Sequence, residues 1–108
     1  MISVKCESPS DVKGHYQFAT YEGFAHWLAD IRRARSGVGA ALCALAEGGS
    51  WRPNKVGCQM QATSDWRYGY DAKELAREVG VINMRRGDSW SKDPQLALEF
   101  ARRLDKLR

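Results

Sequence analysis

The sequence predicts an α+β fold, with a small antiparallel-rich sheet of three or four strands and about four helices packed on one face. Two kinds of pattern lead to this prediction. Apolar and polar residues alternate in three segments, at 2–7, 15–20 and 56–62, as they do in half-buried strands. Four other segments have the apolar spacing or the end signals of helices. At 108 residues the chain has the length of one domain, so we expect residues 1–108 to form a single compact unit.

The first two alternating segments predict a hairpin. In 2–7 the apolar residues occupy the even positions, and in 15–20 Tyr16 and Phe18 share one side. The stretch between them begins with Pro9 and ends with Gly14, residue types that favour turns. We therefore expect the two strands to pair with each other.

A helical hairpin is predicted for residues 22–47. In its first helix the apolar residues recur at helical spacing, at Phe24, Trp27, Leu28 and Ile31. Ser36 can cap the second helix, whose apolar stripe contains Val38, Leu42 and Leu45. Gly48 and Gly49 are expected to end it, because glycine accepts the left-handed conformation that terminates many helices.

Two helices are predicted in the second half of the chain. The third helix begins at Asp71, as a cap to which Glu74 reaches back, and stops at Gly80. A short strand at 81–84 is expected to follow. The last helix has Asp93 as its cap and Pro94 at its first position, where a missing N–H costs nothing. Its Leu98 points away from the apolar stripe, which marks a position for contact with a partner.

Composition and charge limit the classes of protein. Hydrophobic residues make up 44% and charged residues 28% of the chain, as in ordinary globular proteins. No apolar run is long enough to cross a bilayer, and the N-terminus lacks the order of a secretory signal, so we expect a cytoplasmic protein without membrane contact. The net charge is +4, and several arginines occur in clusters, at 32–35, 85–86 and 102–103. This mild positive charge is compatible with an acidic partner and does not require one.

The residue types needed for catalysis or metal binding are not arranged at useful spacings. His15 and His26 are the two histidines, and neither is placed with a cysteine at the spacing of a metal site. The odd number of cysteines, three, argues against a disulfide framework. We therefore expect no cofactor, no metal site and no catalytic residue, and predict that the protein is not an enzyme.

Aromatic and arginine residues gather in segments predicted as loops, and we expect the partner to bind there. The candidate residues are Trp51 and Arg52 in one such segment, Trp66, Arg67, Tyr68 and Tyr70 in another, and Arg85 and Arg86 in the turn or strand that follows. Trp, Tyr and Arg are the usual anchors of protein interfaces. The alternative is that these rings fill the core from beneath the loops, because large aromatic side chains are highly buried on average.

Part of a helix-turn-helix pattern is present at 72–90. Ala76 supplies the small residue of a first helix, and Gly80 opens the turn. In the second half, Arg85, Arg86 and Gly87 stand where a recognition helix needs an apolar anchor and good helix formers. Direct DNA or RNA binding through this partial motif is the alternative function.

These observations predict a non-enzymatic binding protein that presents an Arg/Trp/Tyr-rich surface to a macromolecule. The expected partner is a protein or a nucleoprotein complex. Small inhibitors of host nucleic-acid machinery from phages and mobile elements, such as anti-CRISPR proteins, are comparable in size and type. No sequence motif supports that comparison, and the oligomeric state is not predicted.

Overall fold

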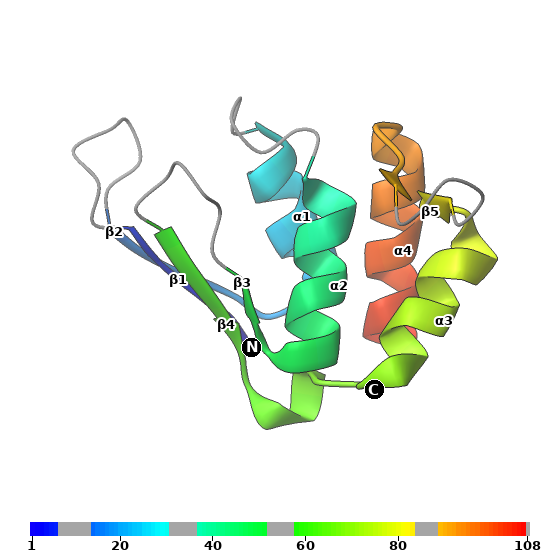
Figure 1. Cartoon of the computed structure of the whole chain (residues 1–108). Coiled ribbons are helices and arrows are strands. Elements are labelled where there is room, and N and C mark those ends of the chain that lie inside the picture. The colour runs from blue at the N-terminus through cyan, green and yellow to red at the C-terminus, as the bar shows by residue number, and fades with distance from the viewer. Residues whose placement is uncertain (7–13, 31–36, 52–57, 84–88, 108) are drawn as a thin grey trace.

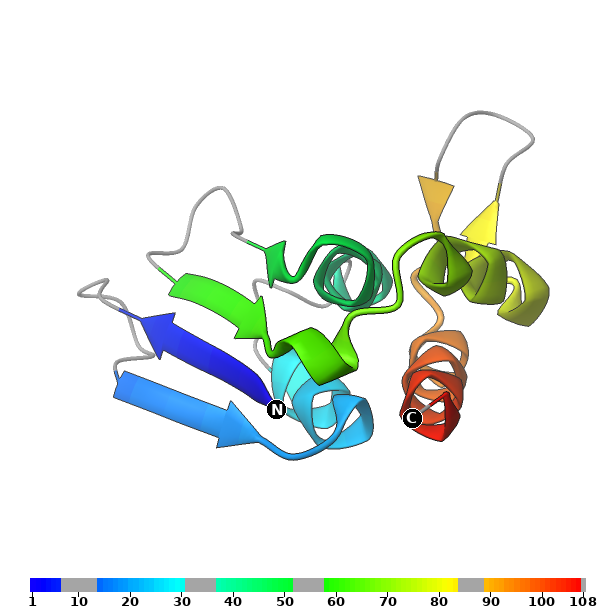
Figure 2. The same cartoon turned by 90° about the horizontal axis from the view of Figure 1, so that it is seen from below.

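The computed structural model describes residues 1–6, 14–30, 37–51, 58–83 and 89–107. Over these ranges the chain forms a four-stranded antiparallel sheet, a separate two-stranded hairpin and four α-helices, which confirms the predicted α+β class. The elements stack in three layers (Figures 1 and 2). The sheet is followed by a layer of α1 (Tyr21–Asp30) and α2 (Val38–Gly48), and then by α3 (Tyr70–Val79) and α4 (Pro94–Lys106).

The strands of the sheet have the order β2-β1-β4-β3, and all neighbours are antiparallel. Their bounds are Ile2–Cys6 for β1, Gly14–Phe18 for β2, Ser50–Trp51 for β3 and Cys58–Ala62 for β4. β1 and β2 pair from Ile2 opposite Phe18 to Cys6 opposite Gly14, as expected for the predicted hairpin. β3 was not predicted, because two residues are too few for an alternating pattern to be recognised.

The two faces of the sheet differ in chemistry, and the helices cover only one of them (Figure 2). The covered face presents Ile2, Val4, Met60 and Ala62, all buried. The register aligns polar residues in two rows on the opposite face: Gln17, Ser3 and Gln61 in one, and His15, Lys5 and Gln59 in the other. The alternation read from the sequence therefore separates a core face from a solvated face, as it does in antiparallel sheets.

Within the described residues, α1 and α2 bury the apolar stripes that the sequence predicts; Ile31, the last member of the first stripe, lies outside those residues. Phe24 of α1 is fully buried, and Trp27 is half-buried with its ring against those of Tyr16 and Phe18. α2 ends at Gly49, whose φ of 84° is the left-handed conformation expected there. Ser36, the predicted cap of α2, lies outside the described residues.

The start of α3 differs from the prediction. The helix begins one residue earlier, at Tyr70, and its N-cap position is Gly69, so Asp71 is not the cap. Glu74 pairs with Arg77, 2.8 Å away, instead of reaching back. At α4 the prediction is confirmed: an Asp93 carboxylate oxygen accepts a hydrogen bond of 2.9 Å from the backbone N–H of Gln95.

A hairpin of two short strands follows α3 where a helix-turn-helix would have its second helix. β5 (Ile82–Asn83) pairs antiparallel with β6 (Ser89–Trp90), and the N–H of Ser91 donates to the carbonyl of Val81 at 2.7 Å, extending the contact. The recognition helix of the alternative function is therefore replaced by strands in the described part of 81–90. Burial of the apolar pair Val81 and Ile82 holds this segment extended against the core.

Candidate functional site

Trp66, the first of the predicted partner residues, belongs to the core. It ends a short 3-10 helix, η1 (Ser64–Trp66), and is only 3% exposed. Its ring meets the fully buried ring of Tyr21 edge-on at 5.3 Å, and its backbone carbonyl accepts a hydrogen bond of 2.7 Å from the Tyr21 hydroxyl. Burial raises the pKa of that hydroxyl well above its ordinary value. Of the two roles left open by the sequence, the structure supports the core role for Trp66.

Arg67 and Tyr68 connect the end of β4 to the end of α2. The Nε atom of Arg67 donates to the carbonyl of Ala62 at 3.0 Å. Its guanidinium lies across Gly49 so closely that a Cβ atom at this position would collide with it. The N–H of Tyr68 donates to the carbonyl of Ala46 at 2.5 Å. Both residues therefore have a structural role.

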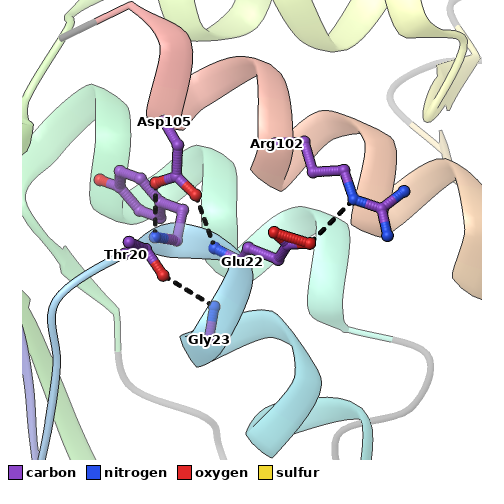
Figure 3. A network of polar contacts seen from close by, with 6 residues as sticks. Thr20, Glu22, Gly23, Arg102 and Asp105 are labelled. Atoms are coloured by element: carbon purple, nitrogen blue, oxygen red, sulfur yellow. Dashed lines mark hydrogen bonds and ion pairs between the residues drawn. The ribbon is translucent and has the colours of Figure 1, made fainter.

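A polar network at the same end joins α4 to α1 (Figure 3). The Asp105 carboxylate accepts hydrogen bonds from the N–H groups of Tyr21 and Glu22, at 2.7 and 3.0 Å. Thr20 caps the same helix by accepting from the N–H of Gly23, and Arg102 pairs with Glu22 at 2.9 Å. A carboxylate at a helix N-terminus is favoured by the helix dipole. We call this part of the molecule, residues 20–23, 46–49, 62–68 and 102–105, the linked end.

The remaining predicted site residues are divided between different places. Tyr70 is 84% exposed at the start of α3, and Trp51 is half-buried in β3 opposite Met60. Arg52, Arg85 and Arg86 lie outside the described residues. The strands that flank 84–88 pack at the start of α2, where Val81 and Trp90 approach Gly39. Arg67 and Tyr68 contact the other end of that 11-residue helix, about 16 Å away, so the described fold separates them from the strands that flank 84–88.

A cavity of about 450 Å³ opens at the end of the molecule opposite the linked end. The last turn of α1, the first turn of α2 and the first turns of α4 surround it, together with residues that follow β6. Its apolar lining is aliphatic and mostly small: Ala25, Ala29, Val38, Pro94, Ala97 and Leu98. We call the region formed by these residues and by residues 26, 30 and 91–93 the open end.

The polar lining of the cavity carries both signs of charge. It consists of His26 and Asp30 from α1 and of Ser91, Lys92 and Asp93 before α4. The Asp93 carboxylate is already engaged as the cap of α4. The predictions missed this site, because its walls come from three helices distant in sequence. Only Leu98 indicated the site in the sequence, because it lies off the apolar stripe of its helix and was predicted to contact a partner. In the structure Leu98 is half-buried and lines the cavity.

A second, shallower hollow of about 130 Å³ lies on the polar face of the sheet, between Lys5, His15 and Gln59 and their neighbours. Strands β1, β2 and β4 contain no carboxylate within their bounds. The described lining therefore includes hydroxyl, amide, imidazole and amine groups but no carboxylate, and Val4 and Tyr16 also contribute to it. It offers no enclosed apolar surface, so we regard the larger cavity as the stronger candidate site.

The two arginines of one predicted basic cluster, 102–103, are paired within the chain. Arg103 pairs with Glu99 at 3.0 Å, as Arg102 does with Glu22. The hydrogen bond from Arg103 lowers the pKa of Glu99, and the one to Glu22 raises the pKa of Arg102. In the described ranges, no three His, Cys, Asp or Glu side chains are grouped as metal ligands would be.

None of the helices in those ranges combines the length and apolarity needed to span a membrane. No protein-family model, curated protein or solved structure matches the chain.

Proposed function

We propose that this protein is a non-enzymatic binding protein that engages an acidic macromolecular partner through its open end. The observation that carries this proposal is an uneven distribution of charge along the chain. Eight of the 17 Lys and Arg residues and ten of the 13 Asp and Glu residues lie in the described ranges, which leaves the described fold with a net charge of −2. The other nine cations and three carboxylates, a net charge of +6, belong to segments 7–13, 31–36, 52–57 and 84–88 and to residue 108.

The elements that bound these four internal segments end on the same side of the fold, at the top of Figure 1. Pairing places Cys6 next to both Gly14 and Cys58, and Asn83 opposite Ser89. Asp30 and Val38 line the same cavity. The four internal segments, whose net charge in the sequence is +5 without Arg108, are therefore attached to one side of the molecule, where they would draw an acidic partner towards the open end.

The partner expected from this charge is a protein or a nucleoprotein complex. Inhibition of host nucleic-acid machinery, by analogy with anti-CRISPR proteins, remains the class of function that we propose. Trp66, Arg67 and Tyr68 are no longer part of the proposed surface because their contacts are internal. Arg52, Arg85 and Arg86 stay in it, together with Arg32, Arg33 and Arg35.

Affinity capture from a bacterial lysate, with and without nuclease and read by mass spectrometry, tests this proposal. We expect one protein, or one defined complex, to be retained after nuclease treatment. The triple substitution of Arg32, Arg33 and Arg35 by Gln should remove most of the captured partner. The matched control replaces Lys73, Arg77 and Lys106 on α3 and α4 by Gln, which changes the net charge equally and should preserve capture.

Two outcomes would contradict the proposal. Equal loss of capture in both triple variants would mean that net charge alone drives binding. Capture that disappears with nuclease, and that weakens steeply with salt as phosphate contacts do, would indicate direct nucleic-acid binding instead.

A further inference from the structure

We infer that two copies of this chain associate through the edge strand β2, so that their sheets join into one continuous antiparallel sheet. β2 (Gly14–Phe18) is the last strand in the order β2-β1-β4-β3, and among the described elements only β1 pairs with it (Figure 2). The outer side of such a strand presents backbone N–H and C=O groups that can pair with another chain. The residues that carry this inference do not line the cavity at the open end, so it is independent of the proposed function.

The strand β2 lacks the features that usually keep an edge strand from pairing. Charged side chains, prolines, bulges and very short strands are the common protections. The five residues of β2 include no Lys, Arg, Asp, Glu or Pro, and they pair with β1 in a regular register without a bulge. The other edge strand, β3, is two residues long. Of the two edges of the sheet, β2 is therefore the one suited to a partner strand.

The core beneath the sheet is less well covered at β2 than at the central strands. On the covered face, the residues of β1 and β4 are all buried: Ile2, Val4, Met60 and Ala62. Tyr16 and Phe18 continue the same two rows into β2, but both are only half-buried. Trp27 of α1 is also half-buried, with its ring centroid 5.2 Å from that of Tyr16 and 5.4 Å from that of Phe18. These three rings, which we call the aromatic margin, leave the core partly exposed along the β2 edge.

A second copy of the chain is the occupant that matches this edge. In an antiparallel pairing of β2 with itself, full overlap of the five residues places Tyr16 at the two-fold axis and His15 opposite Gln17 of the other copy. No like charges then face each other across the two strands. Because this axis is perpendicular to the sheet, the helices of both copies lie on the same side. The two aromatic margins therefore meet at the axis and cover each other.

The predicted interface is small, so the dimer should be weak. Each copy contributes the five residues of β2 and Trp27, fewer than the roughly 20–30 residues per side of a standard interface. Sedimentation equilibrium of the full chain over a range of concentrations measures the association. We expect a monomer–dimer equilibrium, and we expect hydrogen exchange of the β2 amides to slow as the protein concentration rises.

Two double variants and a matched control assign the dimer to β2. The like-charge variant, His15→Glu with Gln17→Glu, sets like charges opposite each other at both symmetry-related pairs and should weaken dimerisation about tenfold or more. The opposite-charge variant, His15→Lys with Gln17→Glu, should restore dimerisation.

The control is Gln59→Glu with Gln61→Glu, on the interior strand β4. It places the same charges on the same exposed face, beside the same two residues of β1, and should leave dimerisation unchanged. All four substituted positions are exposed, so these variants should fold like the wild-type protein, which thermal melts check.

A chain that sediments as a monomer at every concentration up to about 1 mM, where the weakest specific complexes form, overturns the inference. In that case, protection of the β2 amides in the captured complex would assign this edge to a strand of the partner instead. The inference is also overturned if the like-charge variant dimerises like the wild type, if the control weakens the dimer equally, or if the opposite-charge variant does not restore it.

Discussion

The two ends of this molecule differ in what their side chains contact. At the linked end, aromatic and charged side chains contact one another: Tyr21 donates to the Trp66 carbonyl, and Asp105 caps α1 from a distance of 84 residues in the sequence. At the open end, alanines on facing helices leave a cavity, and Lys92 and His26 stand at its rim. A cluster of Trp, Tyr and Arg in a sequence therefore identifies an energetically important place without distinguishing a core from an interface.

The difference follows from which groups have partners inside the chain. Arg67 and Arg102 each donate a hydrogen bond to an acceptor within the linked end, so both guanidinium groups already have a partner inside the chain. The open end has an enclosed apolar surface that no described side chain fills. At the linked end, these polar groups are bonded to other groups of the same chain. At the open end, we propose that a partner contacts the exposed surface.

Truncation of the linked end's central ring should give the largest effect. Trp66→Ala removes a buried indole that packs on Tyr21, and it should lower the free energy of unfolding by about 3–5 kcal/mol. Chemical denaturation measures this change, and capture of the partner by the remaining folded protein should persist. Loss of capture at unchanged stability would return Trp66 to the interface.

A smaller loss of stability is expected when the Tyr21 hydroxyl, which donates a hydrogen bond to the Trp66 carbonyl, is removed. Tyr21→Phe leaves the carbonyl of Trp66 without this buried donor and should cost about 1–3 kcal/mol. Because burial raises the pKa of Tyr21, its contribution to stability is complete below the ordinary tyrosine pKa near 10 and is lost as the pH rises above that value.

Stability measured from neutral to strongly alkaline pH checks the sign of this effect. The wild-type protein should lose stability above about pH 10 more steeply than Tyr21→Phe does. Parallel pH profiles for the two proteins would show that the Tyr21 hydroxyl is not perturbed by its surroundings.

The smallest effects should come from two helix caps, one at each end. Asp93→Ala removes the local cap of α4 and should cost about 1 kcal/mol. Asp105→Ala removes a carboxylate that accepts two N–H groups of α1 and links α4 to it, so about 1–2 kcal/mol is expected. Thermal melts of both variants rank them. A larger loss of stability for Asp93→Ala than for Asp105→Ala would contradict the view that the linked end is held together by tertiary contacts and the open end is not.

Features set by neighbouring residues could be predicted from the sequence. Asp93, Pro94 and the N–H of Gln95 form a cap within three positions, and the left-handed Gly49 and Gly80 end their helices as expected. The alternation in β1, β2 and β4 was enough to predict which face is buried. These features depend on local backbone chemistry and on a period of two or 3.6 residues.

Features set by tertiary contacts could not be predicted in this way. Asp71 has the sequence of a cap, but the chain enters α3 through Gly69, immediately after Tyr68 has bonded to Ala46 of α2. The burial of Trp66 depends on Tyr21, 45 residues earlier. The cavity depends on three helices that meet, and only Leu98 gave any indication of it.

The division between a linked end and an open end is tested most directly by hydrogen exchange with mass spectrometry, on the free protein and on the captured complex. We predict that the partner protects the amides of residues 26–40 and 89–98, and that residues 62–72 exchange as in the free protein. Protection confined to 62–72, with the cavity segments unchanged, would contradict this division and place the interface on the aromatic cluster.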